Sequence, residues 1–180
     1  MPRTPVRPER RGSIQSEIGQ ARPFRSLSQE ATITLLRTAS VVTRVFARVI
    51  EPEGLSFAQY NALRIIRGAG AGGIPTLTIR ERMIDEGTTI TRLLDKLETA
   101  GLIERERSLP DRRQVICHAT EAGKRLLDRL DPKIDELDDL AIGFLPERRI
   151  EQLIRTLDAI RHENAERGAP RSAVKTGAEV

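Results

Sequence analysis

Residues 78–119 read TIRERMIDEGTTITRLLDKLETAGLIERERSLPDRRQVICHA, and this stretch decides the fold that we predict for the chain. Its middle part has apolar residues at three- and four-residue spacing, the pattern of one helix face: Ile90, Leu93, Leu94 and Leu97. The opposite face is polar and carries Thr88, Thr89, Thr91, Arg92 and Lys96. We predict an amphipathic helix that is capped at its start by Thr88 or Thr89.

A second, shorter helix is predicted immediately upstream. Thr78 and Glu81 match the Thr-x-x-Glu capping box, which would open this helix. Ile79, Met83 and Ile84 are then expected to turn inward. A short helix, a tight connection and a longer helix together indicate a helix-turn-helix.

Beyond Gly101 the apolar period changes from helical spacing to alternation. Residues 102–107 and 114–119 read as two strands, and the Ser-Leu-Pro-Asp-Arg-Arg segment at 108–113 reads as their turn. The predicted fold class is therefore mainly α with a small β-hairpin wing, a winged helix-turn-helix. N- and C-terminal helices with broad apolar stripes flank it, and these stripes are expected to make them dimerisation helices.

Three segments in a fixed order resemble the MarR family of transcription regulators. They are LSFAQYNALRII at 55–66, TTITRLLDKLETAGLIERERSLPDRRQVICHATEAGKRLL at 88–127, and the acidic helix that follows. The likeness runs from roughly Leu35 to Ile160. It implies a homodimeric, mostly helical protein that binds double-stranded DNA at palindromes near promoters. Such proteins often release DNA when a small-molecule effector binds.

Length and composition fit one domain with two tails. The chain has 180 residues, of which 38% are hydrophobic and 31% charged, as in soluble globular proteins. We predict a disordered basic tail at 1–26, a winged domain at 27–163 and a flexible C-terminal tail at 164–180. The absence of a long apolar run or secretory signal predicts a cytoplasmic location without membrane contact.

The net charge of +4 is a poor argument for DNA binding, because residues 1–30 supply +3 of it through six arginines and three glutamates. Those arginines would either touch DNA as a basic arm or form a solvated tail. The local arrangement of charge is more informative. Negative charge gathers in one later helix, at Asp128, Asp131, Asp135, Glu136, Asp138 and Asp139.

Further helices follow from helical spacing of apolar residues at 29–50, 56–67, 120–142 and from about 145 to 162. Pro132 is expected to interrupt the third of these. Residues 68–75, GAGAGGIP, lack the Gly-Lys-Ser/Thr ending of a P-loop and are interpreted as a flexible connector.

The predicted DNA contacts lie early in the longer helix of the helix-turn-helix. Thr88, Thr89, Thr91 and Arg92 are expected to reach base edges, and Lys96 is placed for a phosphate. Threonines at a helix start also serve simply as caps. The arginine-rich hairpin that follows favours DNA.

The family resemblance also assigns roles at the tip of the wing. It implies that Asp111 braces the hairpin by pairing with a neighbouring arginine and that Arg113 enters the minor groove, with Arg112 on a phosphate. Arg105 and Arg107 alternate with glutamates, so cross-strand ion pairs are the alternative for these two arginines.

The remaining candidates concern ligands and chemistry. By analogy with the family, an effector would bind near Arg44, Phe46 or Tyr60. Cys117, the one cysteine, is interpreted as a core residue, and His118 as exposed strand surface. We expect no metal site, no cofactor and no catalytic residues, hence no enzyme.

Two functions remain open at this stage. The first is a sequence-specific, homodimeric repressor that binds a pseudo-palindromic operator and is released by a small molecule. The second is a dimeric protein-interaction module that uses the acidic helix and binds DNA only non-specifically.

Overall fold

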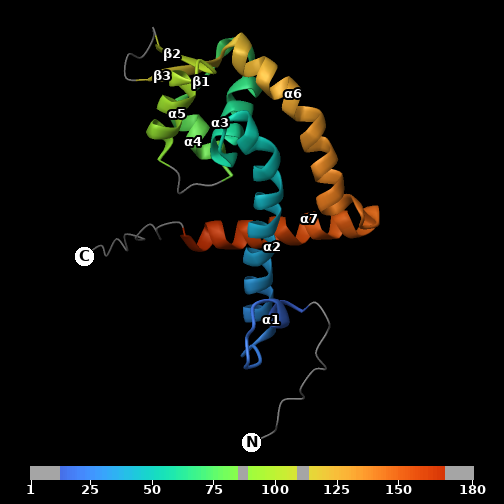
Figure 1. Ribbon diagram of the computed structural model, residues 1–180. Coiled ribbons are helices and arrows are strands. Elements are labelled where there is room, and N and C mark those ends of the chain that lie inside the picture. The colour runs from blue at the N-terminus through green and yellow to red at the C-terminus, as the bar shows by residue number, and fades with distance from the viewer. Residues whose placement is uncertain (1–12, 85–88, 109–113, 169–180) are drawn as a thin grey trace, which may run out of the picture. The chain divides into compact units, whose positions relative to one another are not determined.

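The computed structural model describes residues 13–84, 89–108 and 114–168 (Figure 1). By its internal packing the chain divides into two compact units between Ile134 and Asp135. The first unit contains the winged module. The second contains the end of one helix and the C-terminal helix.

The winged module is built from three helices and a small sheet. Helices α3 (Phe57–Gly68), α4 (Thr76–Arg82) and α5 (Ile90–Thr99) pack beside strands β2 (Ile103–Arg107) and β3 (Val115–Ala119) (Figure 1). The antiparallel β2 and β3 place Arg105 opposite Cys117. The predicted mainly α fold with a hairpin wing is confirmed, and both predicted strands agree with the structure to within one residue.

A third strand was missing from the prediction. β1 (Ile74–Pro75) pairs antiparallel with β3, so the sheet order is β1-β3-β2. The segment that we interpreted as a flexible connector at 68–75 therefore ends in the sheet. Ile74 is buried opposite Cys117, and this pairing supplies the stability that a two-residue segment lacks alone.

Two expectations about α4 were wrong. The helix begins at Thr76 with Pro75 as its N-cap residue and no side-chain cap, so Thr78 and Glu81 do not open it. The fixed φ of proline makes Pro75 a suitable start. Ile79 and Met83 are buried as predicted, but Ile84 is 70% exposed because α4 has already ended at Arg82.

α2 (Leu27–Ile50) precedes the module and begins where the side chain of Ser26 accepts a hydrogen bond from the backbone N–H of Gln29. It ends in a 3-10 turn at Glu51–Glu53, after which Gly54 adopts a φ of 83° that favours glycine. We predicted residues 1–26 to be disordered. The described part of this segment instead contains α1 (Ile14–Glu17), whose Ile14 is buried.

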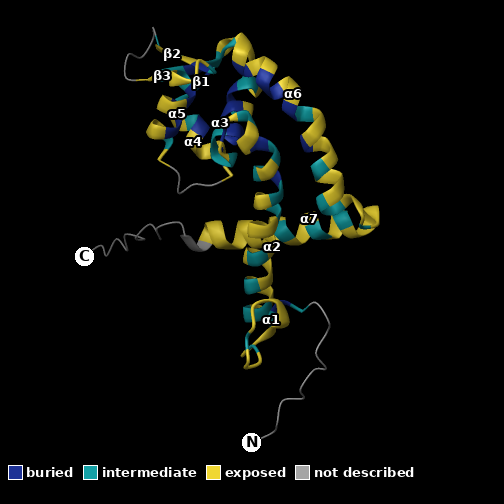
Figure 2. Cartoon of the chain, in the orientation of Figure 1, coloured by how far each residue is buried: buried dark blue, intermediate teal, exposed yellow. Residues whose placement is uncertain are grey.

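The core of the first unit lies between α3, α5, the sheet and the start of α6 (Glu121–Asp138). Leu63, Leu94, Leu97, Ile103, Leu127 and Leu130 are among its fully buried side chains. In Figure 2 the buried residues are the dark blue stretches of the ribbon, which gather in the helices and strands of the winged module and in the first part of α6. These residues come from distant parts of the chain, so the core packs α5 against the sheet.

α6 starts as predicted, with the side chain of Thr120 accepting a hydrogen bond from the backbone N–H of Gly123 at 3.1 Å. The same hydroxyl donates to the carbonyl of Gly101 and so ties α6 to the end of α5. The expected interruption at Pro132 was wrong, because α6 is continuous across it. Leu130 and Ile134, both buried, hold the helix on either side of the lost backbone hydrogen bond.

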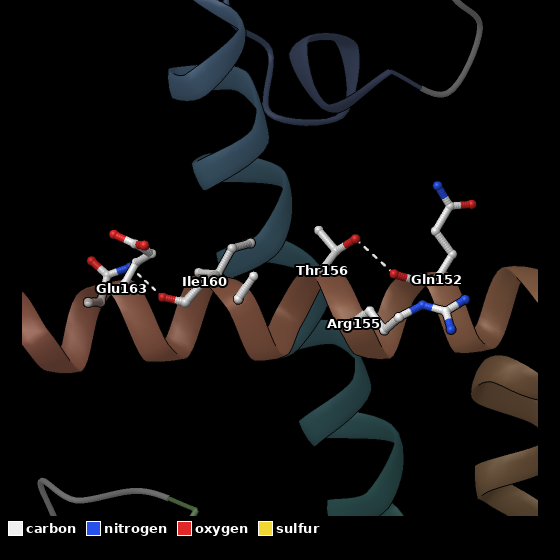
Figure 3. A pocket seen from close by; sticks show the side chains of 7 residues that line it. Gln152, Arg155, Thr156, Ile160 and Glu163 are labelled. Atoms are coloured by element: carbon white, nitrogen blue, oxygen red, sulfur yellow. Dashed lines mark hydrogen bonds between the residues drawn. The ribbon is translucent and has the colours of Figure 1, made fainter.

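In the second unit, a π-helical turn (Asp139–Gly143) leads into α7 (Glu147–Gly168). Of the α7 side chains that the structure describes, residues 147–166, none is buried (Figure 2). A shallow hollow runs along one face of this helix beside Thr156 and Ile160 (Figure 3). Within the described ranges, no helix combines the length and apolarity needed to span a bilayer.

Candidate nucleic-acid interface

α5 presents a polar face on the outside of the first unit. Leu93, Leu94 and Leu97 are buried, whereas Thr89, Thr91, Arg92 and Lys96 are exposed. Thr89 occupies the N-cap position, but its side chain makes no capping hydrogen bond. Thr88 lies outside the described residues. The hydroxyl of Thr89 is thus not used by the cap, contrary to the simpler interpretation of a threonine at a helix start.

The guanidinium of one β2 residue links the wing to α5. Arg105, in β2, donates from Nε to Glu98 Oε2 at 2.9 Å, and its Nη2 pairs with both Glu98 and Asp95. Both carboxylates belong to α5. Cross-strand pairing, the alternative considered for Arg105, is therefore not what the structure shows, since these partners lie on α5 and not on β3.

This cluster has a clear electrostatic consequence. The hydrogen bond from Arg105 holds the pKa of the Glu98 carboxyl below its ordinary value, and Glu98 in turn raises the pKa of the guanidinium. One positive charge, 23% exposed, thus partly offsets two negative charges on α5. A polyanion approaching α5 is repelled less by Asp95 and Glu98 than it would be without Arg105.

A hollow of about 540 Å³ lies between α4, α5 and the strands. Thr76, Thr78 and Arg80 line it from α4, Thr91 and Leu94 from α5, and Arg105 and Val115 from the sheet. Its mixed apolar and polar wall adjoins Thr91, one of the predicted base-contacting residues.

The wing closes as a hairpin, with the backbone N–H of Ser108 donating to the carbonyl of Gln114 at 3.0 Å. The tip residues Asp111, Arg112 and Arg113 lie outside the described residues. Their assigned roles therefore remain predictions.

The structure places an exposed polar helix beside a hairpin, and comparison with known proteins agrees with this arrangement. The MarR family model matches residues 55–115, which include α3, α4, α5 and β2. A crystal structure of a MarR transcription factor from Planctomyces limnophilus is 34% identical, with a TM-score of 0.58, covering 76% of this chain and 99% of that one. The chain belongs to the MarR family.

Other members agree with this assignment. The HTH-type transcriptional regulator TtmR of Methylorubrum extorquens is 28% identical over 153 residues, 85% of this chain and 76% of that protein. CouR from Rhodococcus jostii RHA1, solved with bound p-coumaroyl-CoA, is 26% identical, with a TM-score of 0.63, covering 76% of this chain and 96% of that one. This MarR-family chain is a transcription regulator and not an enzyme.

The three residues expected near an effector are not gathered around either hollow described above. Arg44 is exposed on α2. Phe46 is buried and meets Phe57 edge to face at 6.3 Å between ring centroids. Tyr60 is buried below Arg64, whose guanidinium carbon lies 5.7 Å from the ring centroid, and burial raises the pKa of its hydroxyl. Their role in binding a ligand stays a prediction.

Cys117 is fully buried, as predicted, and burial raises the pKa of its thiol. His118 is less exposed than expected: its side chain is half-buried, with Nε2 3.1 Å from Glu106 Oε1. Gly73, at a φ of 65°, leaves the space that the imidazole occupies, because a Cβ there would collide with the ring. Within residues 13–84, 89–108 and 114–168, no group of three potential metal ligands occurs.

Sequence reasoning missed two side chains that organise this MarR-family module. Asn61 is buried in α3, where its Oδ1 accepts a hydrogen bond from the backbone N–H of Ile84 at 2.9 Å. Arg67, also in α3, pairs with Asp128 and Asp131 of α6. The signal for Asn61 was present, since it follows Phe57 by four residues and so falls on the apolar face.

Proposed function

We propose that this chain is a homodimeric repressor that binds a pseudo-palindromic operator and leaves it when a small-molecule effector binds. The observation that carries the proposal is the exposed polar face of α5, formed by Thr89, Thr91, Arg92 and Lys96. Nothing in the first unit that the structure describes covers these side chains. In a helix-turn-helix, the second helix enters the major groove with its early residues on base edges.

Each side chain has a distinct role in this proposal. Arg92 donates two hydrogen bonds to a guanine, and Thr91 and Thr89, with Thr88, contact bases or a thymine methyl. Lys96 lies a turn further along the helix and neutralises a phosphate. Arg113 of the wing enters the minor groove, Arg112 binds a phosphate, and Asp111 braces the turn.

Exposed apolar surface on the two long helices supports the homodimer. α2 leaves Leu27, Leu36 and Val41 exposed, and α7 leaves Ile154 and Ile160 exposed. A 22-residue helix without a buried side chain among those described gains little stability from its own unit. A second copy would cover these faces and place two α5 helices in major grooves about 34 Å apart.

The effector part of the proposal has separate support. CouR, a relative of this chain, was solved with a bound coenzyme A ester. In this chain Arg44, Phe46 and Tyr60 are the residues assigned to an effector. A ligand would weaken DNA binding only by binding more tightly to a dimer whose α5 helices are wrongly spaced.

The interaction-module alternative is less favoured. Asp128 and Asp131, which belong to the acidic group on α6, already pair with Arg67 of the same chain. A partner surface would have to be formed without Asp128 and Asp131. The exposed acidic residues that remain for it are Asp135, Glu136, Asp138 and Asp139.

Nuclease footprinting of the DNA upstream of the chain's own gene tests the proposal. A protected and symmetric site is expected. Uniformly weak, salt-sensitive binding without a protected site would contradict the repressor and support the alternative.

A further inference from the structure

Asn61 is a polar side chain inside the core of the winged module. It is 8% exposed and lies in α3 next to the buried Ala62 and Leu63. The other buried residues that the structure describes, apart from glycine, are hydrophobic. A carboxamide in such a place costs free energy unless its polar atoms are hydrogen-bonded.

The hydrogen bond that Asn61 makes lies at the end of α4. The helix stops at Arg82, and Met83 turns into an extended conformation with φ −64° and ψ 141°. Beyond that turn, the backbone N–H of Ile84 donates to Asn61 Oδ1 at 2.9 Å, joining residues 23 apart in sequence. Asn61 therefore holds the backbone at the point where the chain leaves α4 on its way to α5.

Apolar contacts alone do not fix the backbone at Ile84 as the hydrogen bond to Asn61 does. The side chain of Ile84 is 70% exposed, so it does not anchor its own residue. Met83 is buried, and Leu93, Leu94 and Leu97 keep α5 against the core. Hydrophobic contacts are non-directional, however, whereas a hydrogen bond weakens steeply when its angle changes.

We infer that Asn61 is a positioning residue for DNA recognition: its hydrogen bond to Ile84 sets the end of α4 and hence the orientation in which α5 meets the major groove. The inference rests on the proposed function of α5. Asn61 itself does not touch DNA in this scheme, because it is buried.

The expected size of the effect follows from the fraction of molecules in the correct orientation. Apparent affinity falls by that fraction when only one orientation binds. Loss of a hydrogen bond of ordinary net strength lowers the ratio of correctly to wrongly oriented molecules about three- to tenfold. Operator affinity is expected to fall by up to that factor, which is reached when the variant is mostly in the wrong orientation.

Three variants separate positioning from stability. Asn61→Leu keeps the approximate size but has no acceptor, and Asn61→Asp keeps an acceptor at the cost of a buried charge. Ile66→Val, five residues further along α3, trims the same core without touching the hydrogen bond. Asn61→Ala, which also lacks an acceptor, replaces the leucine variant if that variant does not fold.

Each full-length variant is measured for thermal unfolding, for hydrogen exchange of the Ile84 amide and for binding to a duplex that contains the footprinted sequence. Asn61→Leu should speed Ile84 exchange and weaken DNA binding measurably, by up to about tenfold. Ile66→Val should change neither the exchange rate of the Ile84 amide nor the affinity for DNA, although it lowers the unfolding temperature. Asn61→Asp should lose stability yet bind DNA more tightly than Asn61→Leu.

The outcomes distinguish the inference from the proposed function. A wild-type chain that protects no sequence removes the proposed function itself. If the wild type binds its site and Asn61→Leu binds equally well, with or without faster exchange at Ile84, the inference is overturned and the function stands. Equal losses of affinity in Asn61→Leu and Ile66→Val would reduce Asn61 to an ordinary core residue.

Discussion

The guanidinium of Arg67 in α3 donates to both carboxylate oxygens of Asp131 in α6, with Nη1 at 2.8 Å from Oδ2 and Nη2 at 3.0 Å from Oδ1. The hydrogen bond that Arg67 donates to Asp131 raises the pKa of the guanidinium. This bidentate ion pair joins α3, which precedes the helix-turn-helix in the sequence, to α6, which follows the wing. Asp128 adds a second carboxylate at 3.2 Å.

Breaking this pair should lower stability modestly. Arg67→Gln is expected to reduce the free energy of unfolding by about 1 kcal/mol, since both side chains are partly exposed and solvent screens the interaction. A double-mutant cycle with Asp131→Asn, followed by urea unfolding, isolates the pairwise energy. A coupling energy indistinguishable from zero would show that the pair contributes no net stability.

Arg92 is expected to read a base. Arg92→Ala should weaken operator binding by roughly 1–3 kcal/mol and relax sequence preference at one position, while Lys96→Ala should weaken all sequences and lower the salt slope by about one. Arg113→Ala should relax sequence preference if Arg113 reaches the minor groove. It should weaken binding to all sequences if Arg113 contacts a phosphate. Fluorescence anisotropy at several salt concentrations measures all three.

Arg129→Ala is the matched control for these variants, because Arg129 is an exposed arginine on α6 that pairs with Glu53. It should leave operator affinity unchanged. A loss for Arg129→Ala as large as that for Arg92→Ala would point to general charge and not to recognition by α5.

Arg105 should act on DNA binding through the carboxylates of α5. Arg105→Met leaves Asp95 and Glu98 without their cation, and their repulsion of DNA phosphate is expected to weaken operator binding several-fold. Adding Asp95→Asn and Glu98→Gln to the same chain should restore most of that affinity. Titration of the triple variant into labelled operator checks this. Failure to restore affinity would indicate that Arg105 contacts DNA directly.

The apolar residues of α7 should be required for assembly. Ile154→Asp combined with Ile160→Asp, at positions 52% and 41% exposed in the single chain, is expected to convert a dimer into monomers. Light scattering coupled to size exclusion measures the mass, and footprinting should show loss of the symmetric site. Arg148→Asp, on the same helix and exposed, should remain dimeric. A monomeric wild type would contradict the homodimer.

Cys117 should be inert in the folded protein. Full burial and the raised pKa of its thiol keep the reactive thiolate scarce at neutral pH. Native protein is expected to react with a thiol reagent such as dithiobis-nitrobenzoate only as fast as it unfolds, and peroxide should leave operator binding unchanged. Rapid labelling of Cys117 without unfolding would overturn this expectation.

Much of the winged module could be predicted because its signals are local. The spacing of Leu93, Leu94 and Leu97 specifies which face of α5 is buried, and alternation specifies the two strands of the wing. The polar face of α5 follows from the same spacing. These features depend on residues within one or two turns of each other.

Features that depend on distant partners were missed or wrong. β1 exists because Ile74 and Pro75 pair with β3, some forty residues later. Arg105 turned to α5 and not to the neighbouring strand, because packing of β2 beside α5 brings Asp95 and Glu98 within reach. The outward position of Ile84 follows from where α4 stops, which Asn61 helps to hold.

By itself, the amino-acid sequence determined the longer helices, the hairpin and the polar face of α5, because hydrophobic periodicity acts over a few residues. Only the tertiary structure decided which charges meet, which amide is held at the end of α4 and how the sheet is completed. Those contacts join segments that are remote along the chain, and periodicity carries no information about which remote segments become neighbours.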